Sequence, residues 1–319
     1  MNAQALVLGY DLVRDREAYA EVLRAAMPGV TVTVVGTEAE ALLAAPASTM
    51  LAAMAHHVTQ AIVDAAPGLR MIQALTTGTD HLDTLRLPPD VTIASARGIH
   101  GPQMAELAFL FMLALARRFP DMLRNQADAT WERWPQPVLR GCTVVVFGVG
   151  TIAEDLALRC QAFGVRTVGV SGARSSAPHF DAVHPRSDLA AVAAQADFLI
   201  VLAPYTEQNH HAIDAQVLAA CKPGAFVINI ARGGVVDEAA LIDALEGGRI
   251  AGAALDVFGT EPLPADSRLW RQKRVIVTPH IGGASSSYAE DLVDLVTHNL
   301  RSFASGDYAT IRNLVRGPR

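Results

Sequence analysis

The sequence predicts an α/β fold with two doubly wound parallel-sheet domains. Short apolar segments rich in β-branched residues alternate with longer helical patterns along the chain of 319 residues, which is typical of parallel sheets with crossover helices. A chain of this length with 51% hydrophobic residues can bury two cores. The helical segment 101–119 is apolar on nearly every face and separates two series of strands. It therefore marks a domain boundary, and we expect it to be buried between domains or in a subunit contact.

The first series of strand segments predicts a small doubly wound domain. Helical patterns separate the segments, for example at 16–26 and 58–65. The predicted strands are ALVLG (5–9), VTVTVV (30–35), TMLAAM (49–54), LRMIQAL (69–75) and VTIASA (91–96).

The second series predicts a dinucleotide-binding sheet of the Rossmann type, because six strands complete such a sheet. Its strands are TVVVFG (143–148), RTVGV (166–170), DFLIVLA (197–203), AFVINIA (225–231), IAGAALDV (250–257) and RVIVTP (274–279). A last helix at about 286–305 follows, and IRNLV beyond it has no obvious place in this sheet. We therefore expect a Rossmann domain at 99–286, inserted into a smaller flavodoxin-like substrate domain at 1–98 and 287–319.

Composition excludes several kinds of partner. The net charge is −6 and lysine occurs only at Lys222 and Lys273, so no basic patch for nucleic acid is expected. No apolar run is long enough to span a bilayer, and the first 15 residues indicate a strand rather than a signal peptide. Cys142, Cys160 and Cys221 stand apart in apolar contexts, which is typical of reduced core thiols. We expect a cytoplasmic protein without a metal, a membrane or a nucleic-acid partner.

A glycine loop follows the strand 143–148. The residues Gly148-Val149-Gly150-Thr151-Ile152-Ala153 match G-x-G-x-x-A between a strand and a helix. Gly148 permits the tight turn, Gly150 lets the backbone approach a pyrophosphate, and Ala153 allows close helix packing. The amino terminus of the helix then faces the anion. The alternative is an ordinary glycine-rich turn that binds nothing.

The end of the strand 166–170 predicts the cofactor type. An acidic residue there binds the ribose 2′-hydroxyl of NAD, but this chain has Ser171, followed by Gly172, Ala173 and Arg174. Hydroxyls and a guanidinium suit a 2′-phosphate, which a carboxylate would repel. The sequence therefore favours NADP(H), with NAD(H) possible if Arg174 is only a solvated loop charge.

Three blocks in the second half resemble the D-isomer-specific 2-hydroxyacid dehydrogenase family, in the family's order and approximate spacing. They are KPGAFVINIARGGVVDEAALIDAL (222–245), AGAALDVFGTEPLP (251–264) and VIVTPHIGG (275–283). Weaker support comes from TTGTDHLD (76–83) and SARGIHGPQMAEL (95–107), so the resemblance covers nearly the whole chain.

The resemblance implies a catalytic set. His280 would be the acid/base that protonates the forming alkoxide, and it stands at the carboxyl end of a strand, where such sheets bind ligands. Glu261 would be its acidic partner, which favours the imidazolium and should extend reductive activity to higher pH. Arg232 would bind the substrate carboxylate and polarise the carbonyl. Backbone amides at Thr77 and Gly78, on the other domain, would hold the same carboxylate, and domain closure would exclude water.

Further cofactor contacts are implied by the same resemblance. Asp256 would lie near the nicotinamide carboxamide. Other positions along the cofactor are Ala203, Pro204, Ile230, Ala231, Arg232, His280 and Gly282, together with Gly148, Gly150, Thr151 and Ile152 of the glycine loop. The segment LAPYTEQNHH departs from the family's L-P-L-T-x-x-T pattern. His81 and His100, near the expected cleft loops, are further candidates for substrate contact.

Within the family, the chain is most similar to glyoxylate and hydroxypyruvate reductases. It ends soon after IRNLV, without the added region of many phosphoglycerate dehydrogenases, and it has Glu261 where formate dehydrogenases have glutamine. We expect an NADPH-dependent reductase of small 2-keto acids to D-2-hydroxy acids, acting as a homodimer. The alternatives are an NAD(H)-preferring dehydrogenase of larger keto acids, a nucleotide-sensing protein without turnover, and a hydrolase that retains NAD.

Overall fold

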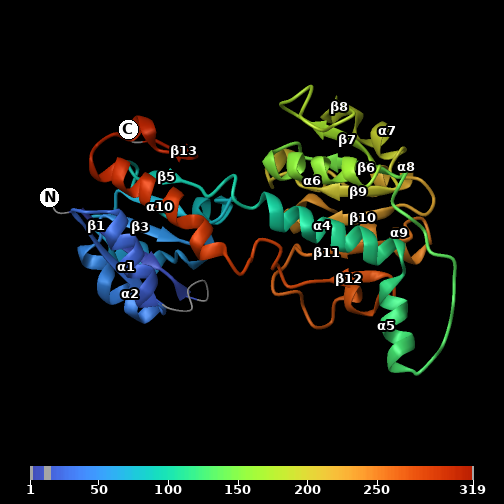
Figure 1. Ribbon diagram of the computed structural model, residues 1–319, viewed down its shortest axis with the longest axis horizontal. Coiled ribbons are helices and arrows are strands. Elements are labelled where there is room, and N and C mark those ends of the chain that lie inside the picture. The colour runs from blue at the N-terminus through green and yellow to red at the C-terminus, as the bar shows by residue number, and fades with distance from the viewer. Residues whose placement is uncertain (1–2, 11–15, 318–319) are drawn as a thin grey trace. The chain divides into compact units, whose positions relative to one another are not determined.

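The computed structural model describes residues 3–10 and 16–317, which form two compact units (Figure 1). Unit 1 comprises Met1–Ile99 with Ser285–Arg319, and unit 2 comprises His100–Ala284. The chain thus leaves unit 1 once and returns to it. Residues 1–2, 11–15 and 318–319, which belong to the first domain that the sequence predicts, lie outside the described residues. Among the described helices, none has the length and apolar character needed to cross a membrane.

Unit 1 is a doubly wound sheet with the strand order β13-β5-β4-β3-β1-β2. The five strands from the first part of the chain are parallel, and β13 joins β5 antiparallel at the edge. IRNLV, which had no place in the second sheet, thus provides an edge strand of the first. The strands are β1 (Ala3–Leu8), β2 (Val30–Val35), β3 (Met50–Ala53), β4 (Met71–Ala74), β5 (Thr92–Ala94) and β13 (Leu314–Arg316).

Alternating side chains of these strands fill one core on each face of the sheet. In β1, Leu6 and Leu8 enter one core while Ala5 and Val7 enter the other, as the two-residue period of a strand requires. Two helices cover each face. The first core is closed by α2 (Glu38–Ala44) and α3 (Gln60–Ala65), the second by α1 (Arg16–Ala26) and α10 (Tyr288–Ala304).

Unit 2 has a seven-stranded parallel sheet with the order β12-β11-β10-β9-β6-β7-β8, so the prediction of six strands was wrong by one. Its strands are β6 (Thr143–Phe147), β7 (Arg166–Ser171), β8 (Ala182–Pro185), β9 (Phe198–Val201), β10 (Phe226–Asn229), β11 (Gly252–Leu255) and β12 (Val275–Val277). The order reverses at β6, and such a switch point is where doubly wound sheets bind their ligands.

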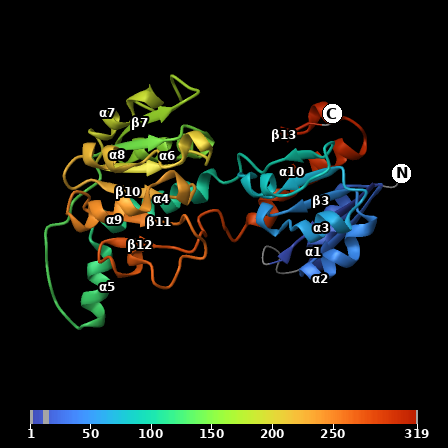
Figure 2. The same ribbon diagram turned by 180° about the vertical axis from the view of Figure 1, so that it is seen from behind.

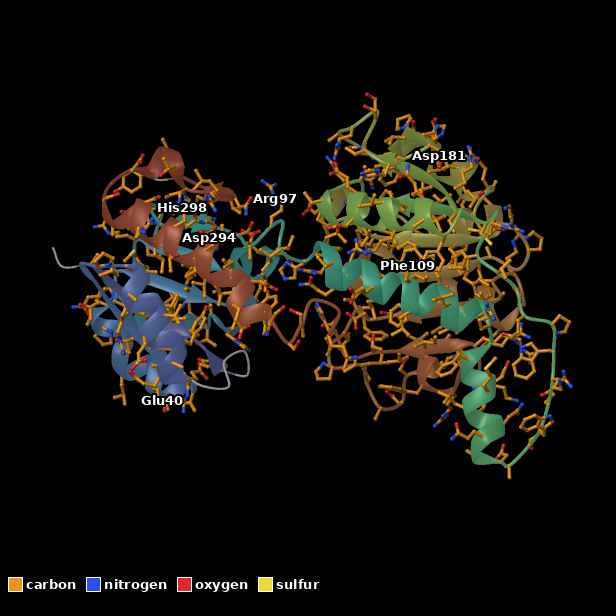
Figure 3. The ribbon with its side chains drawn as sticks, in the orientation of Figure 1. Glu40, Arg97, Phe109, Asp181, Asp294 and His298 are labelled. Atoms are coloured by element: carbon orange, nitrogen blue, oxygen red, sulfur yellow. The ribbon has the colours of Figure 1, made fainter. Side chains whose placement is uncertain are left out.

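The strand missed from the sequence is the edge strand β8. Its sequence AVHP contains a proline and a histidine and is only partly buried, so it lacks the apolar run of a central strand. Asp181, labelled in Figure 3, precedes it and accepts a hydrogen bond from the Thr167 N–H at 2.7 Å. That bond joins β8 to the start of β7, a contact that no local pattern in the sequence indicates.

Helices cover both faces of the second sheet, as Figures 1 and 2 show. The helices α4 (Gly101–Ala116) and α6 (Thr151–Ala162) pack on one face. The other face is covered by α7 (Leu189–Ala193), α8 (Ala215–Ala220) and α9 (Glu238–Glu246). The apolar helix expected at 101–119 is α4, which ends at Ala116, and a second helix, α5 (Phe119–Ala127), begins at the last residue of the expected segment. Most of α4 is buried against unit 2 itself, although Leu110 stays exposed.

Candidate active site

Three charged side chains follow three neighbouring strands of unit 2. Arg232 comes after β10, Glu261 after β11 and His280 after β12. Because β10, β11 and β12 are parallel neighbours, their carboxyl ends lie at one edge of the sheet. The sheet therefore gathers, at that edge, residues that are separated by up to 48 positions in the sequence.

Glu261 and His280 form a hydrogen-bonded pair. The Oε2 atom of Glu261 lies 2.7 Å from Nδ1 of His280, and Oε1 accepts the Phe258 N–H at 2.9 Å. Burial raises the pKa of the Glu261 carboxyl, but the hydrogen bonds from His280 and Phe258 and the positive charges of His280 and Arg232 hold the pKa below its ordinary 4.5. Glu261 is thus a carboxylate at neutral pH, fixed in position by a backbone donor and able to orient the imidazole.

The loop that carries His280 is held by Asp256, a buried residue directly after β11. Oδ1 accepts the Thr278 hydroxyl at 2.5 Å and the Ile281 N–H at 3.0 Å, and Oδ2 accepts the Gly282 N–H at 2.8 Å. His280 lies between these donors with φ of +54°, a left-handed conformation that costs energy for a residue with a side chain. Asp256 therefore stabilises the turn that presents the imidazole.

Arg232 is positioned by a turn that Asn229 holds. The buried Asn229 side chain donates to the Arg232 carbonyl at 3.0 Å and accepts the Ala231 N–H at 3.1 Å. The guanidinium donates to the Ala231 carbonyl at 2.8 Å. Directly after it, a Cβ on Gly233 would stand 1.9 Å from the Phe258 carbonyl carbon. Only glycine allows this close packing of the Arg232 turn against the segment that leads to Glu261.

The glycine loop fits the pyrophosphate of a dinucleotide. Gly148 has φ of +105°, and a Cβ there would stand 2.2 Å from the Ala203 nitrogen, so the loop packs tightly against the segment after β9. Gly150 is the N-cap residue of α6, and no described side chain accepts a hydrogen bond from the first N–H groups of that helix. A Cβ on Gly150 would meet nothing within 4 Å. Open space beside Gly150, the first residue before α6, suits an anion bound at the amino terminus of that helix.

Ser171 ends β7 and organises the next loop. Its hydroxyl accepts the N–H of Ala173 at 3.2 Å and the N–H of Arg174 at 3.1 Å. The Arg174 guanidinium donates to Oε1 of Glu154, in the first turn of α6, at 2.5 Å. Glu154 was not among the residues predicted from the sequence. Its place one residue after the G-x-G-x-x-A motif, on the helix beside β7, is the only signal that could have found it.

The remaining predicted positions are spread over both units. Ala203 and Ile230 are buried at the ends of β9 and β10, while Pro204 is exposed and its carbonyl accepts the Asn209 side chain at 2.7 Å. Thr77 and Gly78 follow β4 in unit 1, where the Thr76 hydroxyl donates to the Gly78 carbonyl at 2.6 Å. That this loop and Arg232 bind one carboxylate stays a prediction.

The two further histidines have structural surroundings. His81 Nε2 lies 3.3 Å from the Val58 carbonyl oxygen within unit 1. His100 is buried at the start of α4. A Cβ added to Gly283 would stand 3.1 Å from Cδ2 of its ring. Contact of either ring with a substrate stays a prediction.

Residues 109–282, more than half of the chain, match the model of the family described as D-isomer specific 2-hydroxyacid dehydrogenase, NAD binding domain. The chain belongs to this family. The family resemblance expected from the three sequence blocks is thereby confirmed, as is the pair of parallel-sheet domains, one of them of the Rossmann type.

Two relatives and one solved structure illustrate the range of this dehydrogenase family. D-3-phosphoglycerate dehydrogenase of Mycobacterium bovis is 36% identical over 290 residues, which cover 86% of this chain but 52% of that protein. The chain thus spans about half the length of that relative. Glyoxylate reductase of Thermococcus litoralis is 32% identical over 260 residues, 78% of each chain. The crystal structure of a D-isomer specific 2-hydroxyacid dehydrogenase from Xanthobacter autotrophicus Py2, in complex with NADPH and MES, is 27% identical, with a TM-score of 0.82 over 99% of this chain and 98% of that one.

Proposed function

We propose that the protein is a reductase of small 2-keto acids, of the glyoxylate and hydroxypyruvate type, which forms D-2-hydroxy acids and prefers NADPH to NADH. The observation that carries the proposal is the Glu261–His280 pair, with Arg232 following the neighbouring strand. Reduction of a 2-keto acid needs a proton donor and a cation for the carboxylate, and these residues are of the types required. Glyoxylate reductase of Thermococcus litoralis, similar over 78% of this chain, supports the substrate class.

In this mechanism His280 transfers the proton. Its Nδ1 faces Glu261, and among the described residues its Nε2 has no hydrogen-bond partner. With Nδ1 held, Nε2 is the nitrogen that exchanges a proton with the substrate oxygen. As the carbonyl carbon gains a hydride, its oxygen takes the proton from Nε2, and the neutral imidazole left behind is reprotonated from solvent. Glu261 stabilises the imidazolium before this step and fixes the ring during it.

Arg232 binds and polarises the substrate. Its guanidinium offers a planar set of N–H donors that matches a carboxylate, and it also places positive charge near the carbonyl oxygen where negative charge develops. The same positive charge helps to lower the pKa of Glu261. The backbone turn fixed by Asn229 limits the conformations of Arg232 before a substrate binds, which reduces the entropy cost of orienting the acid.

A nicotinamide dinucleotide, when bound, supplies the hydride. Thr151 and Ile152 would bind its pyrophosphate through the amino terminus of α6, with Gly150 leaving the space that the backbone approach needs. Ser171 and Arg174 would meet the adenosine ribose. The related Xanthobacter enzyme was crystallised with NADPH, which supports the preference predicted from Ser171 and Arg174.

Initial rates with four acids test the proposal. Glyoxylate, hydroxypyruvate, pyruvate and phenylpyruvate would each be reduced by the purified full chain with NADPH and with NADH. We expect turnover with the smaller acids and a higher kcat/KM with NADPH. Absence of turnover with every acid, in a protein shown to bind a dinucleotide, would contradict the reductase assignment and favour a nucleotide-sensing role.

A second candidate is an NAD(H)-preferring dehydrogenase of larger keto acids. The ion pair between Arg174 and Glu154 favours it, because a guanidinium bound to a carboxylate attracts a 2′-phosphate less strongly. The same rate measurements separate the two candidates. A higher kcat/KM with NADH, and with phenylpyruvate rather than glyoxylate, would support the second.

We also propose a homodimer, formed through the segment 119–138. None of the residues of α5 is buried, and large apolar side chains in this segment are left uncovered, namely Phe119, Leu123, Trp131 and Val138. Trp131 is 92% exposed, which is unusual for so large an apolar side chain. A second copy of the chain, related by a two-fold axis, is the simplest partner that would cover this surface.

A further inference from the structure

The loop after β7 and the first turn of α6 are connected by one ion pair. Arg174 Nη1 and Glu154 Oε1 lie 2.5 Å apart, with 38% and 27% of the two side chains exposed. Within the described part of the chain this is the one ion pair formed by either residue. The pair is half-buried rather than fully solvated, so solvent screens its charges only in part.

Backbone contacts fix where the guanidinium can go. The Ser171 hydroxyl accepts the N–H groups of both Ala173 and Arg174, so the loop folds back over the end of β7. Arg174 therefore begins close to the strand end, where the adenosine ribose binds in sheets of this type. From there its side chain extends to α6 and donates to Glu154, while 38% of it stays exposed.

The electrostatic result is a positive charge cancelled by an adjacent negative one. A phosphate monoester carries a charge of about −1.5 to −2 at neutral pH. Arg174 attracts such a group and Glu154 repels it. To bind the phosphate, Arg174 must also give up or share its contact with Glu154. A ribose with a free 2′-hydroxyl carries no charge, so neither effect applies to it.

We propose that Glu154 is a specificity-determining residue, which limits the preference for NADPH over NADH through its ion pair with Arg174. This inference rests on the proposed dinucleotide-dependent function. Arg174 supplies the attraction for the 2′-phosphate, and Glu154 sets how much of that attraction is available. The chain therefore binds both cofactors, with a smaller difference between them than Arg174 by itself would produce.

The substitution Glu154→Gln tests this inference by binding, without turnover. Glutamine keeps the length and the helix propensity of glutamate but removes its charge. The ligands are NADPH and NADH, and the fragments adenosine 2′,5′-bisphosphate and 5′-AMP, titrated calorimetrically against the full chain. We expect the variant to bind both 2′-phosphorylated ligands roughly fivefold more tightly, as expected for losing a partly exposed charge interaction. The affinities for NADH and 5′-AMP should stay within about twofold.

Glu246→Gln is the matched control. Glu246 forms an ion pair of the same type with Arg268, at the end of α9, so the substitution has the same chemistry away from the glycine loop. It should leave all four affinities unchanged. Weaker binding of adenosine 2′,5′-bisphosphate by Glu154→Gln would mean that Glu154 orients Arg174 toward the phosphate, and would overturn the inference. Equal changes for all four ligands, or none, would do the same. Failure of the wild-type chain to bind any dinucleotide would instead contradict the proposed function.

Discussion

Glu261 and His280, 19 residues apart in the sequence, share a hydrogen bond of 2.7 Å from Oε2 to Nδ1. The two residues follow adjacent parallel strands, so the sheet itself brings them together. The backbone N–H of Phe258 holds the second carboxylate oxygen. The carboxylate is therefore oriented by the main chain and the imidazole by the carboxylate, an arrangement that prepares one ring nitrogen for proton transfer.

Replacing His280 by glutamine should remove most turnover but keep cofactor binding. Glutamine can still hydrogen-bond to Glu261, but it cannot donate a proton at neutral pH. We expect kcat to fall by roughly a hundredfold to ten-thousandfold, the usual contribution of general acid–base catalysis. NADPH titration of the variant provides the control, since its dissociation constant should hardly change. Retained turnover would exclude His280 as the proton donor.

Glu261→Gln should alter the pH dependence of reduction. Because the pKa of Glu261 lies below its ordinary value of 4.5, the side chain is ionised at neutral pH. Its negative charge there favours the imidazolium. Without that charge, the alkaline limb of the kcat/KM profile should move to lower pH. An unchanged alkaline limb would show that the carboxylate only orients the ring.

The same pKa has a consequence for stability. A carboxyl whose pKa is lower in the folded than in the unfolded chain stabilises the fold at pH values above its pKa in the unfolded chain. This contribution is lost as the pH falls through its pKa in the folded chain. The stability difference between wild type and Glu261→Gln should therefore shrink as the pH falls below about 4.5. Because the Glu261 side chain is 35% exposed, the difference should be small.

Asp256→Asn should lower both stability and turnover. The carboxylate accepts three donors, from Thr278, Ile281 and Gly282, and an amide would turn its NH2 group toward one or more of them. Loss of a buried charge-assisted hydrogen bond costs about 1.5–3 kcal/mol, which corresponds to a fall in Tm of roughly 3–12 °C. A loosened loop would misplace His280 and reduce kcat about tenfold or more.

Thr278→Val is the matched control for Asp256→Asn. It removes one of the three donors and leaves the charge and both backbone donors in place. Its effects on Tm, by calorimetry, and on kcat should be clearly smaller. If the valine variant lost as much activity as Asp256→Asn, the hydroxyl rather than the carboxylate would hold the loop.

The family blocks were predictable because each lies at a strand end, where apolar runs stop and polar residues begin. His280 and Arg232 could therefore be placed at the ligand edge before the structure was known. The contacts of Asp256 could not, because its partners follow a strand more than 20 residues later. A continuous apolar run identifies the central strands but not β8, whose edge position tolerates AVHP. The Glu154–Arg174 contact depends on how the loop after β7 folds back, which spacing alone does not indicate.

Arg174→Asp should weaken NADPH binding much more than NADH binding. The substitution replaces a cation by an anion beside the expected 2′-phosphate, and Glu154 would add a second repulsive charge. We expect the dissociation constant for NADPH to rise roughly tenfold to a hundredfold, and that for NADH less than about threefold. Arg166→Asp, at the amino end of the same strand, is the control and should change neither. Equal losses for both cofactors would make Arg174 a solvated loop charge.

Trp131→Glu should convert the proposed dimer to a monomer. A charge at the centre of an apolar contact is costly when it has no partner, and Trp131 is the most exposed large apolar side chain described. Light scattering at micromolar concentration would measure the mass of each variant. Leu43→Glu, at an exposed apolar position on α2 of unit 1, is the control that should remain dimeric. A monomeric wild type would contradict the dimer, and a dimeric Trp131→Glu variant would place the interface on a different surface. In either case the uncovered side chains of 119–138 would need another explanation, because so large an apolar surface is seldom left open to water.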